Sequence, residues 1–161
     1  MKYTPIIGTL GYVLSPDKKK VLMVHRIARK DDDQLGKFNG LGGKMEKNED
    51  VHTCMEREIF EEAGIRCKDI TLRGTVNWTG FGPKNENWLG FIFRIDTFEG
   101  SPFKENNEGP LEWVEIDQLD SLPMWKGDKH YLGLVFDEDP RMFHGYMAYE
   151  GDEPTTWSFV R

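Results

Sequence analysis

Three glutamates with helical spacing are the residues best suited to chemistry in this sequence: Glu58, Glu61 and Glu62. Residues three and four positions apart share one face of a helix, so Glu58 would face both of the others, at the cost of like-charge repulsion. Glu58 and Glu62 would also lie at the edge of the inward face, where a carboxylate needs a partner or a metal ion. The apolar stripe that defines this inward face consists of Val51, Met55, Ile59 and Ala63.

A glycine-rich segment, Gly40 to Lys44, leads into these carboxylates. Its glycines allow the backbone to approach closely and can offer carbonyl oxygens to a cation. Carboxylate, carbonyl and phosphate oxygens together make a hard environment that suits Mg²⁺ or Mn²⁺ rather than zinc. The four histidines are scattered and form no competing metal motif. The alternative interpretation is an ordinary charged surface helix, which the glycine-rich lead-in and the position of the glutamates weaken.

Hydrophobic periodicity and turn residues predict the elements that would position this cluster. Helices are predicted over 49–63, with Asn48 as N-cap and Gly64 as the stop, and over 128–137. The polar residues 27–39 predict a loop. Strands are predicted over 5–14, 20–26, 69–79, 88–97 and 111–116, and a closing hairpin over 143–150 and 155–160. This pattern predicts a mixed α/β or α+β fold with helices covering a sheet, as one domain over residues 1–161.

Charge and composition exclude several classes of protein. The 161 residues include 21 basic and 28 acidic side chains, a net charge of −7, which disfavours binding to long nucleic acid or anionic lipid. A hydrophobic content of 38% is too high for a disordered chain. Cys54 and Cys67 lack CxxC spacing and the N-terminal segment lacks a signal-peptide pattern, so we expect a cytoplasmic setting. No stretch approaches the roughly 18 apolar residues of a membrane span.

The segment from Gly43 to Ile65 resembles the Nudix box. That motif is a glycine, five residues, a glutamate, seven residues, Arg-Glu, an aliphatic residue, any residue, Glu-Glu, any residue, a glycine and an aliphatic residue. The chain meets every fixed position with Gly43, Glu49, Arg57, Glu58, Ile59, Glu61, Glu62, Gly64 and Ile65. A match over so many fixed positions is far more specific than a lone glycine pattern.

The resemblance implies the Nudix fold, a mixed sheet between helices, in which the box forms a loop, a helix and a loop. It also implies hydrolysis of a nucleoside diphosphate linked to another moiety, with a divalent metal such as Mg²⁺. On this basis the three glutamates of the helix are the expected catalytic and metal-binding carboxylates, with the carbonyl of Gly43 also at the metal. Glu49 and Arg57 are expected to form a structural salt bridge. The identity of the general base stays open, because it varies within the family.

Residues outside the box resemble MutT-type members of the family, in particular the animal enzymes for oxidised purine nucleoside triphosphates. The likeness extends from about residue 36 to residue 149. It implies that Asn39, preceded by Phe38, contacts a purine and that Trp125 stacks on the base. In those enzymes two consecutive acids read the purine edge; here Gly127 replaces the first, and only Asp128 remains.

The same likeness places Glu108 near the metal. Elementary chemistry supports a nucleotide pocket independently, because amides and carboxyls can pair with a base edge and aromatic faces stack on any base. Trp78 and Trp88, on predicted central strands, could line this cleft, although a core position is the commoner role for a tryptophan. Lys44 and Arg26 could hold phosphate oxygens or remain solvated surface charges.

Three functions are therefore compared. The first is an Mg²⁺-dependent pyrophosphohydrolase that cleaves nucleoside triphosphates, including oxidised purine deoxynucleotides of the 8-oxo-dGTP type, to monophosphate and pyrophosphate. The second is a Nudix hydrolase for ADP-ribose, a dinucleoside polyphosphate or a capped RNA end, the RNA version being disfavoured by the acidic charge. The third is a nucleotide-sensing domain without catalysis, which could tolerate loss of a box glutamate; none is lost here. The oligomeric state stays open.

Overall fold

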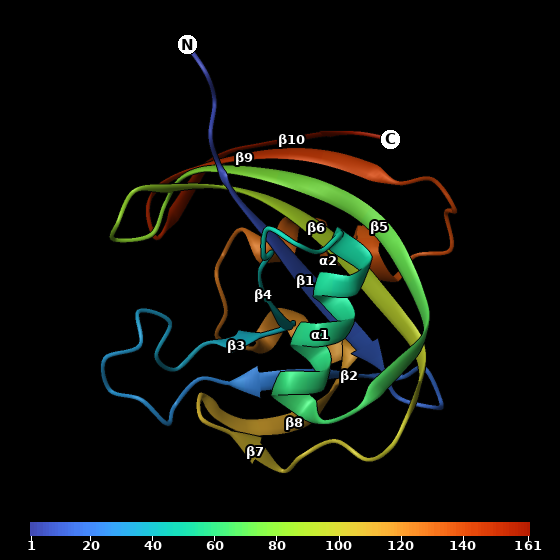
Figure 1. The fold of residues 1–161 in the computed structure, drawn as a ribbon. Helices are drawn as coiled ribbons and strands as arrows, with labels where there is room; N and C mark the ends of the chain where they lie inside the picture. The colour runs from blue at the N-terminus through green and yellow to red at the C-terminus, as the bar shows by residue number, and fades with distance from the viewer.

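A mixed ten-stranded sheet runs through the computed structural model, which describes residues 1–161 (Figure 1). Its main path has the order β10-β9-β5-β6-β1-β2-β8-β7, while β3 pairs with β2 and β4 pairs with β1. The strands are β1 (Ile6–Leu14), β2 (Lys20–His25), β3 (Phe38–Asn39), β4 (Leu41–Lys44), β5 (Arg66–Phe81), β6 (Glu86–Glu99), β7 (Glu105–Asn106), β8 (Gly109–Glu115), β9 (Phe143–Gly151) and β10 (Glu153–Val160). The β1–β6 and β5–β9 pairs are parallel, so the prediction of a mixed sheet is confirmed.

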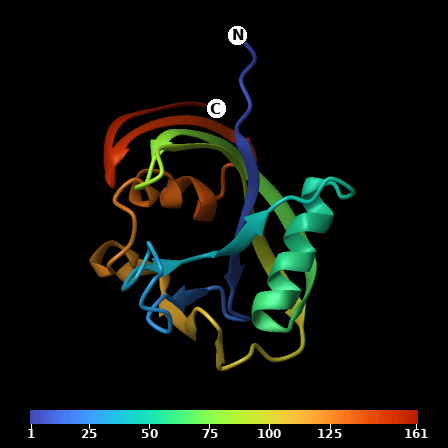
Figure 2. The same cartoon turned by 60° about the vertical axis from the view of Figure 1, so that its left-hand side comes forward.

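The two helices lie on opposite faces of the sheet (Figure 2). They are α1 (Val51–Ala63) and α2 (Asp128–Phe136), and a short 3₁₀ helix, η1 (Ile116–Ser121), follows β8. Side chains alternate between the two faces along each strand. On β1, Tyr12 therefore joins the core beneath α2, whereas its neighbour Val13 joins the core beneath α1. The predicted architecture of a sheet between helices is confirmed.

Helix α1 begins at Val51, two residues later than the predicted start at Glu49. The N-cap is Asp50, whose Oδ1 accepts a hydrogen bond of 2.7 Å from the backbone N–H of Thr53. The prediction of Asn48 as N-cap was wrong, because Glu49 is held outside the helix by its ion pair with Arg57. The predicted stop at Gly64 is confirmed: this residue has a φ of 73°, which glycine adopts without strain.

Most other predicted boundaries differ by a few residues. The strands β5 and β6 continue past the predicted 69–79 and 88–97, because their long antiparallel pairing extends through polar residues with several register shifts. The short helix η1 was not predicted. The predicted loop 27–39 contains one short strand, β3, at its end. Neither helix combines the length and the apolar character that a membrane crossing demands.

The buried guanidinium of Arg73 fixes the far end of α2. It donates hydrogen bonds to the backbone oxygens of Leu134, Val135 and Asp137, at 3.2, 3.1 and 3.3 Å. The last carbonyls of a helix have no partner within the helix, so these bonds supply partners that the helix itself cannot. They also hold α2 in place, with Asp128 at its other end.

Candidate functional site

A cavity of about 310 Å³ opens on the α2 side of the sheet. This volume is within the range found for small-molecule sites. Its walls come from β1, the segment between β2 and α1, the central strands β5 and β6, and the loop before α2. One end is lined by Gln34, Asn39, Trp78, Phe81, Trp125 and Asp128, and the other by Arg26, Gly42, Gly43, Lys44 and Trp88. The cavity thus joins an aromatic end to a glycine-rich end.

Trp125 dominates the aromatic end. It lies in the irregular segment before α2, as predicted, and is only 4% exposed. The ring of Trp125 contacts Phe81, with centroids 4.4 Å apart. The ammonium of Lys37 lies 4.8 Å from the centroid of the Trp125 ring. The indole nitrogens of Trp78, Trp88 and Trp125 are buried without a hydrogen-bond partner in the protein. The three tryptophans thus supply apolar wall to the cavity, while their N–H groups are enclosed in the protein.

Asp128, the first residue of α2, also lines the cavity. Its Oδ1 accepts a hydrogen bond of 3.1 Å from the hydroxyl of Tyr131, which in turn lies 3.3 Å from the hydroxyl of Tyr12. Burial raises the pKa of Asp128 to about 7, against the opposing effect of the Tyr131 hydrogen bond. This carboxyl can consequently accept a hydrogen bond or, when protonated, donate one.

Packing explains why a glycine precedes Asp128. A Cβ atom placed at Gly127 would lie 2.2 Å from both the sulfur of Met147 and the hydroxyl oxygen of Tyr149. The backbone N–H of Gly127 donates to that same hydroxyl over 3.0 Å. Tyr149 thus occupies the space that a side chain at position 127 would need, and the cavity has a single acid at this end.

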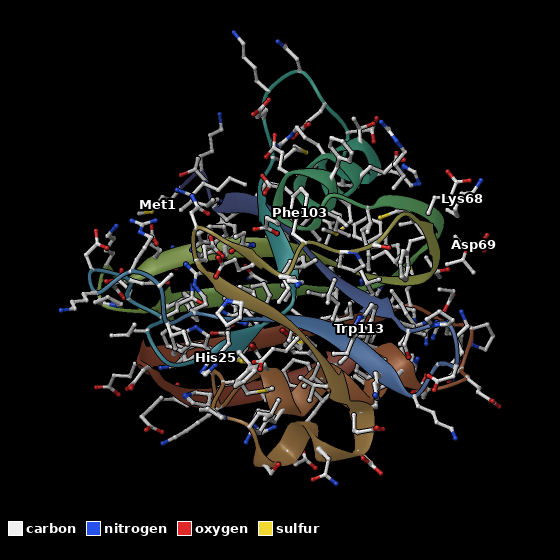
Figure 3. All side chains as sticks on the ribbon, turned by 90° about the horizontal axis from the view of Figure 1, so that it is seen from below. Met1, His25, Lys68, Asp69, Phe103 and Trp113 are labelled. Carbon is white, nitrogen blue, oxygen red and sulfur yellow. The ribbon has the colours of Figure 1, made fainter.

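Asn39 and Phe38, neighbours on β3, face different surroundings. Asn39 lines the cavity, and its Nδ2 donates to Oε1 of Gln34 over 2.6 Å. Phe38 does not line the cavity; its ring stacks on His25, labelled in Figure 3, with centroids 4.0 Å apart. Successive side chains of a strand point to opposite sides, so only one of the two can face a ligand.

The glycine-rich end of the cavity is bordered by the helix α1. Gly43 packs directly against Glu58: a Cβ at this glycine would lie 2.6 Å from the carboxyl carbon of that glutamate. The N–H of Gly42 donates to Oε2 of Glu62 over 2.9 Å. Burial, with the nearby charges of Glu108 and Glu58, raises the pKa of Glu62 to about 9. A carboxylate in this position is stabilised by any cation that approaches it.

Arg57 holds the other carboxylates of the box. Its Nε and Nη2 donate to the two carboxylate oxygens of Glu49, at 2.9 and 2.7 Å, and these bonds lower the pKa of Glu49 to about 2. Its Nη1 donates to Glu58 over 2.8 Å and to Glu61 over 3.3 Å. The side chain of Glu61 is 57% exposed and points further outward than that of Glu58, which is 15% exposed.

The acidic side chains near β4 offer only oxygen donors. No group of three histidine, cysteine, aspartate or glutamate side chains converges in the geometry of a metal site. Glu58 and Glu61 instead bond to Arg57, and Glu108 lies 3.6 Å from Arg26. The donor set still fits a hard divalent ion, because Glu62 and Glu58 lie largely buried beside the backbone of Gly42 and Gly43 and Glu108 contributes a nearby charge. Rotations of these side chains would be needed to gather them around one ion.

Several lining residues were not singled out from the sequence. Gln34 belongs to a polar loop, and Phe81 lies beyond the end of the strand predicted over 69–79. Neither residue is therefore part of a recognisable motif. Gly8 and Gly90 make room for tryptophan rings, since a Cβ at Gly90 would lie 2.2 Å from Trp78 and one at Gly8 would lie 3.1 Å from Trp88. The glycines within the predicted strands were the one feature of the sequence that could have indicated these close contacts with tryptophan rings. Of the two lysines near the cavity, Lys44 lies 5.7 Å above the Trp88 ring.

The chain is similar to several known proteins. The model of the NUDIX domain matches residues 5–134. A zebrafish protein named oxidized purine nucleoside triphosphate hydrolase is 30% identical over 151 residues, which cover 94% of this chain and 91% of the relative. The crystal structure of the MutT protein from Bacillus halodurans has a TM-score of 0.82 and 28% identity, covering 96% of this chain and 97% of that one. An NAD-capped RNA hydrolase, NudC of Pseudomonas syringae, is 29% identical over 66% of this chain but only 37% of its own length.

Proposed function

The chain belongs to the Nudix hydrolase family, and from this premise we propose that it is a metal-dependent nucleoside triphosphate pyrophosphohydrolase of the MutT type. The proposed products are a nucleoside monophosphate and pyrophosphate, and the proposed substrates include oxidised purine deoxynucleotides of the 8-oxo-dGTP type. The observation that carries the proposal is the single cavity that connects an aromatic end to the glycines beside Glu58 and Glu62. The name of the zebrafish relative supports the same substrate class.

The proposed roles follow from position in this cavity. A base would stack on Trp125, and its edge would pair with Asn39 and Asp128. The triphosphate would extend past Gly43, where Lys44 can hold an oxygen by charge. Glu58, Glu61 and Glu62, with the Gly43 carbonyl and Glu108, would hold Mg²⁺ or Mn²⁺. When bound there, a divalent ion would offset phosphate charge and would lower the pKa of a water molecule. One of the glutamates would accept a proton from the attacking water.

A side-by-side rate comparison tests this proposal. The panel contains 8-oxo-dGTP, dGTP, dATP, ADP-ribose, a dinucleoside polyphosphate and an NAD-capped RNA, each with Mg²⁺, with Mn²⁺ and with a chelator. We expect the triphosphates to give the highest kcat/KM, with pyrophosphate as a product, and the chelator to abolish turnover. A higher kcat/KM for any of the other three substrates would overturn the substrate class. Saturable nucleotide binding without product in either metal would instead establish a sensing domain.

Hydrolysis of capped RNA is the second candidate, because NudC of Pseudomonas syringae is among the relatives. The match covers little more than a third of that protein, and the net charge of −7 disfavours contact with a long polyanion. A small nucleotide needs only the cavity and a bound cation, so we rank hydrolysis of small nucleotides before hydrolysis of capped RNA.

We further propose that residues 1–161 form one Nudix domain that acts on small nucleotides in the cytoplasm. Two observations support this proposal: the core beneath α2 includes residues from β1 to β9, and both cysteines are free. Size-exclusion chromatography with light scattering would give the oligomeric state.

A further inference from the structure

Gln34 is held in the cavity wall by a chain of polar contacts. The carboxylate of Asp32, only 5% exposed, accepts hydrogen bonds from Nε and Nη2 of Arg26 at 2.7 and 3.1 Å. The same carboxylate accepts the backbone N–H of Gln34 over 2.9 Å. Arg26 also lies 3.6 Å from Glu108, so the loop is anchored on the acidic side of the cavity. Gln34 therefore occupies a fixed position rather than the tip of a free loop.

The amides of Gln34 and Asn39 form one hydrogen-bonded unit at the aromatic end. Asn39 Nδ2 donates to Gln34 Oε1 over 2.6 Å, and both residues line the cavity. Asn39 Oδ1 and Gln34 Nε2 bond to no other group of the protein and so remain available to a ligand. Rotation of both amides by 180° preserves the bond with its direction reversed, because each amide has one acceptor and one donor end. The hydrogen-bonding capacity of the residue at position 34 consequently determines which orientations of the Asn39 amide keep this bond.

We propose that Gln34 is a positioning residue for base selectivity, because its hydrogen-bonding capacity determines which orientations the Asn39 amide can adopt. This inference rests on the proposed function, in which Asn39 pairs with a purine edge. The nitrogen at position 7 is an acceptor in guanine and carries a hydrogen in the 8-oxo form. An amide oxygen turned to that nitrogen favours the oxidised base, whereas an amide NH₂ favours the normal base. The neutral Gln34 permits both orientations, and a residue with only acceptors or only donors permits one.

Two opposite substitutions test this inference. In Gln34→Glu the carboxylate can only accept, so Asn39 keeps its oxygen toward the base. In Gln34→Lys the ammonium can only donate, so Asn39 turns its NH₂ toward the base. One hydrogen bond changes a binding constant by about 3- to 10-fold. We therefore expect the ratio of kcat/KM for 8-oxo-dGTP to that for dGTP to rise by about this factor in Gln34→Glu and to fall in Gln34→Lys, mostly through KM.

The ratio cancels any general effect of the new charge on a triphosphate, because both substrates carry the same phosphates. Gln34→Met, which removes the amide, should bring the ratio between those of the two charged variants. Gln118→Met is the matched control, on the exposed surface of η1, and should leave the ratio unchanged. Equal ratios in Gln34→Glu and Gln34→Lys, or shifts in the same direction, would overturn the inference. Failure of the proposed function would look different, since the wild-type protein would then not hydrolyse either triphosphate.

Discussion

The carboxylate of Glu62 receives one hydrogen bond from the protein, from the backbone N–H of Gly42 over 2.9 Å, and this bond joins strand β4 to helix α1. The bond occupies Oε2 and leaves Oε1 available. Burial and two neighbouring carboxylates raise the pKa of this side chain to about 9, so its charged form is unfavourable in the protein alone. The Glu62 carboxylate thus has a fixed orientation, and a nearby cation would strongly stabilise its charged form.

Glu62→Gln should lower kcat by about 10²- to 10⁴-fold, the range typical for loss of a catalytic acid or base. The substitution keeps the size of the side chain and removes its ability to hold a cation or accept a proton. Steady-state kinetics with 8-oxo-dGTP and dGTP measure the effect. Glu56→Gln is the matched control, because Glu56 is an exposed residue of the same helix that contacts His52. Wild-type activity in Glu62→Gln would exclude this glutamate from the site.

Binding of the metal alone should be measurable without substrate. An ion that binds only the folded protein stabilises it by RT ln(1 + [L]/Kd), about 2.7 kcal/mol at a concentration one hundred times Kd. We expect Mg²⁺ or Mn²⁺ to raise the Tm of the wild-type protein and of Glu56→Gln by several degrees. Glu58→Gln and Glu62→Gln should lose most of this increase. If the increase in Tm is the same in all four proteins, the ion binds elsewhere.

Gly43→Ala should impair catalysis by displacing Glu58. The new Cβ would lie 2.6 to 2.7 Å from the carboxyl group of Glu58, closer than atoms in contact tolerate. Overpacking of this kind costs about 1–3 kcal/mol of stability, and we expect a loss of kcat of at least about 10-fold in addition. Gly133→Ala is the control, since nothing lies within 4 Å of a Cβ at this exposed position of α2. That variant should keep full activity and gain up to about 1 kcal/mol of stability. Normal kcat in Gly43→Ala would show that Glu58 can move freely.

The Nudix segment could be predicted from the sequence because its chemistry is local. Spacing along one helix placed Glu58 and Glu62 at the edge of the buried face, and Gly64 ended the helix as expected. The N-cap was misplaced because an ion pair from a later turn, Glu49 with Arg57, competes with local helix signals. Gln34 could not be recognised at all, since its place in the cavity wall depends on the hydrogen bonds of Asp32 with Arg26 and with the backbone of Gln34.

The replacement of an acid by Gly127 shows the same limit. The sequence reveals the substitution but not its cause, which lies more than twenty residues away in the hydroxyl of Tyr149. The residue type at such a position depends on contacts between segments far apart in the sequence. Hydrophobic periodicity contains no information about these contacts. Only the three-dimensional packing shows that the cavity has room for one acid at this end.

Asp128 should make the stability of the protein depend on pH. Burial raises its pKa from 3.8 to about 7 in the folded protein, so the folded state keeps a proton that the unfolded state releases. The stability from this residue is full below about pH 4 and is lost as the pH rises through about 7. A shift of this size corresponds to ~4 kcal/mol, and we expect about half of that because the carboxyl borders an open cavity.

Asp128→Asn removes this loss, because an amide does not ionise and its oxygen can still accept the hydrogen bond from Tyr131. The free energy of unfolding of the variant, relative to wild type, should therefore increase by about 2 kcal/mol between pH 4 and pH 8. Urea denaturation at several pH values measures this difference. Asp33→Asn, in an exposed part of the loop after β2, should follow the wild-type profile throughout. A constant difference between Asp128→Asn and wild type across this range would mean that Asp128 is already ionised at pH 4 in the folded protein.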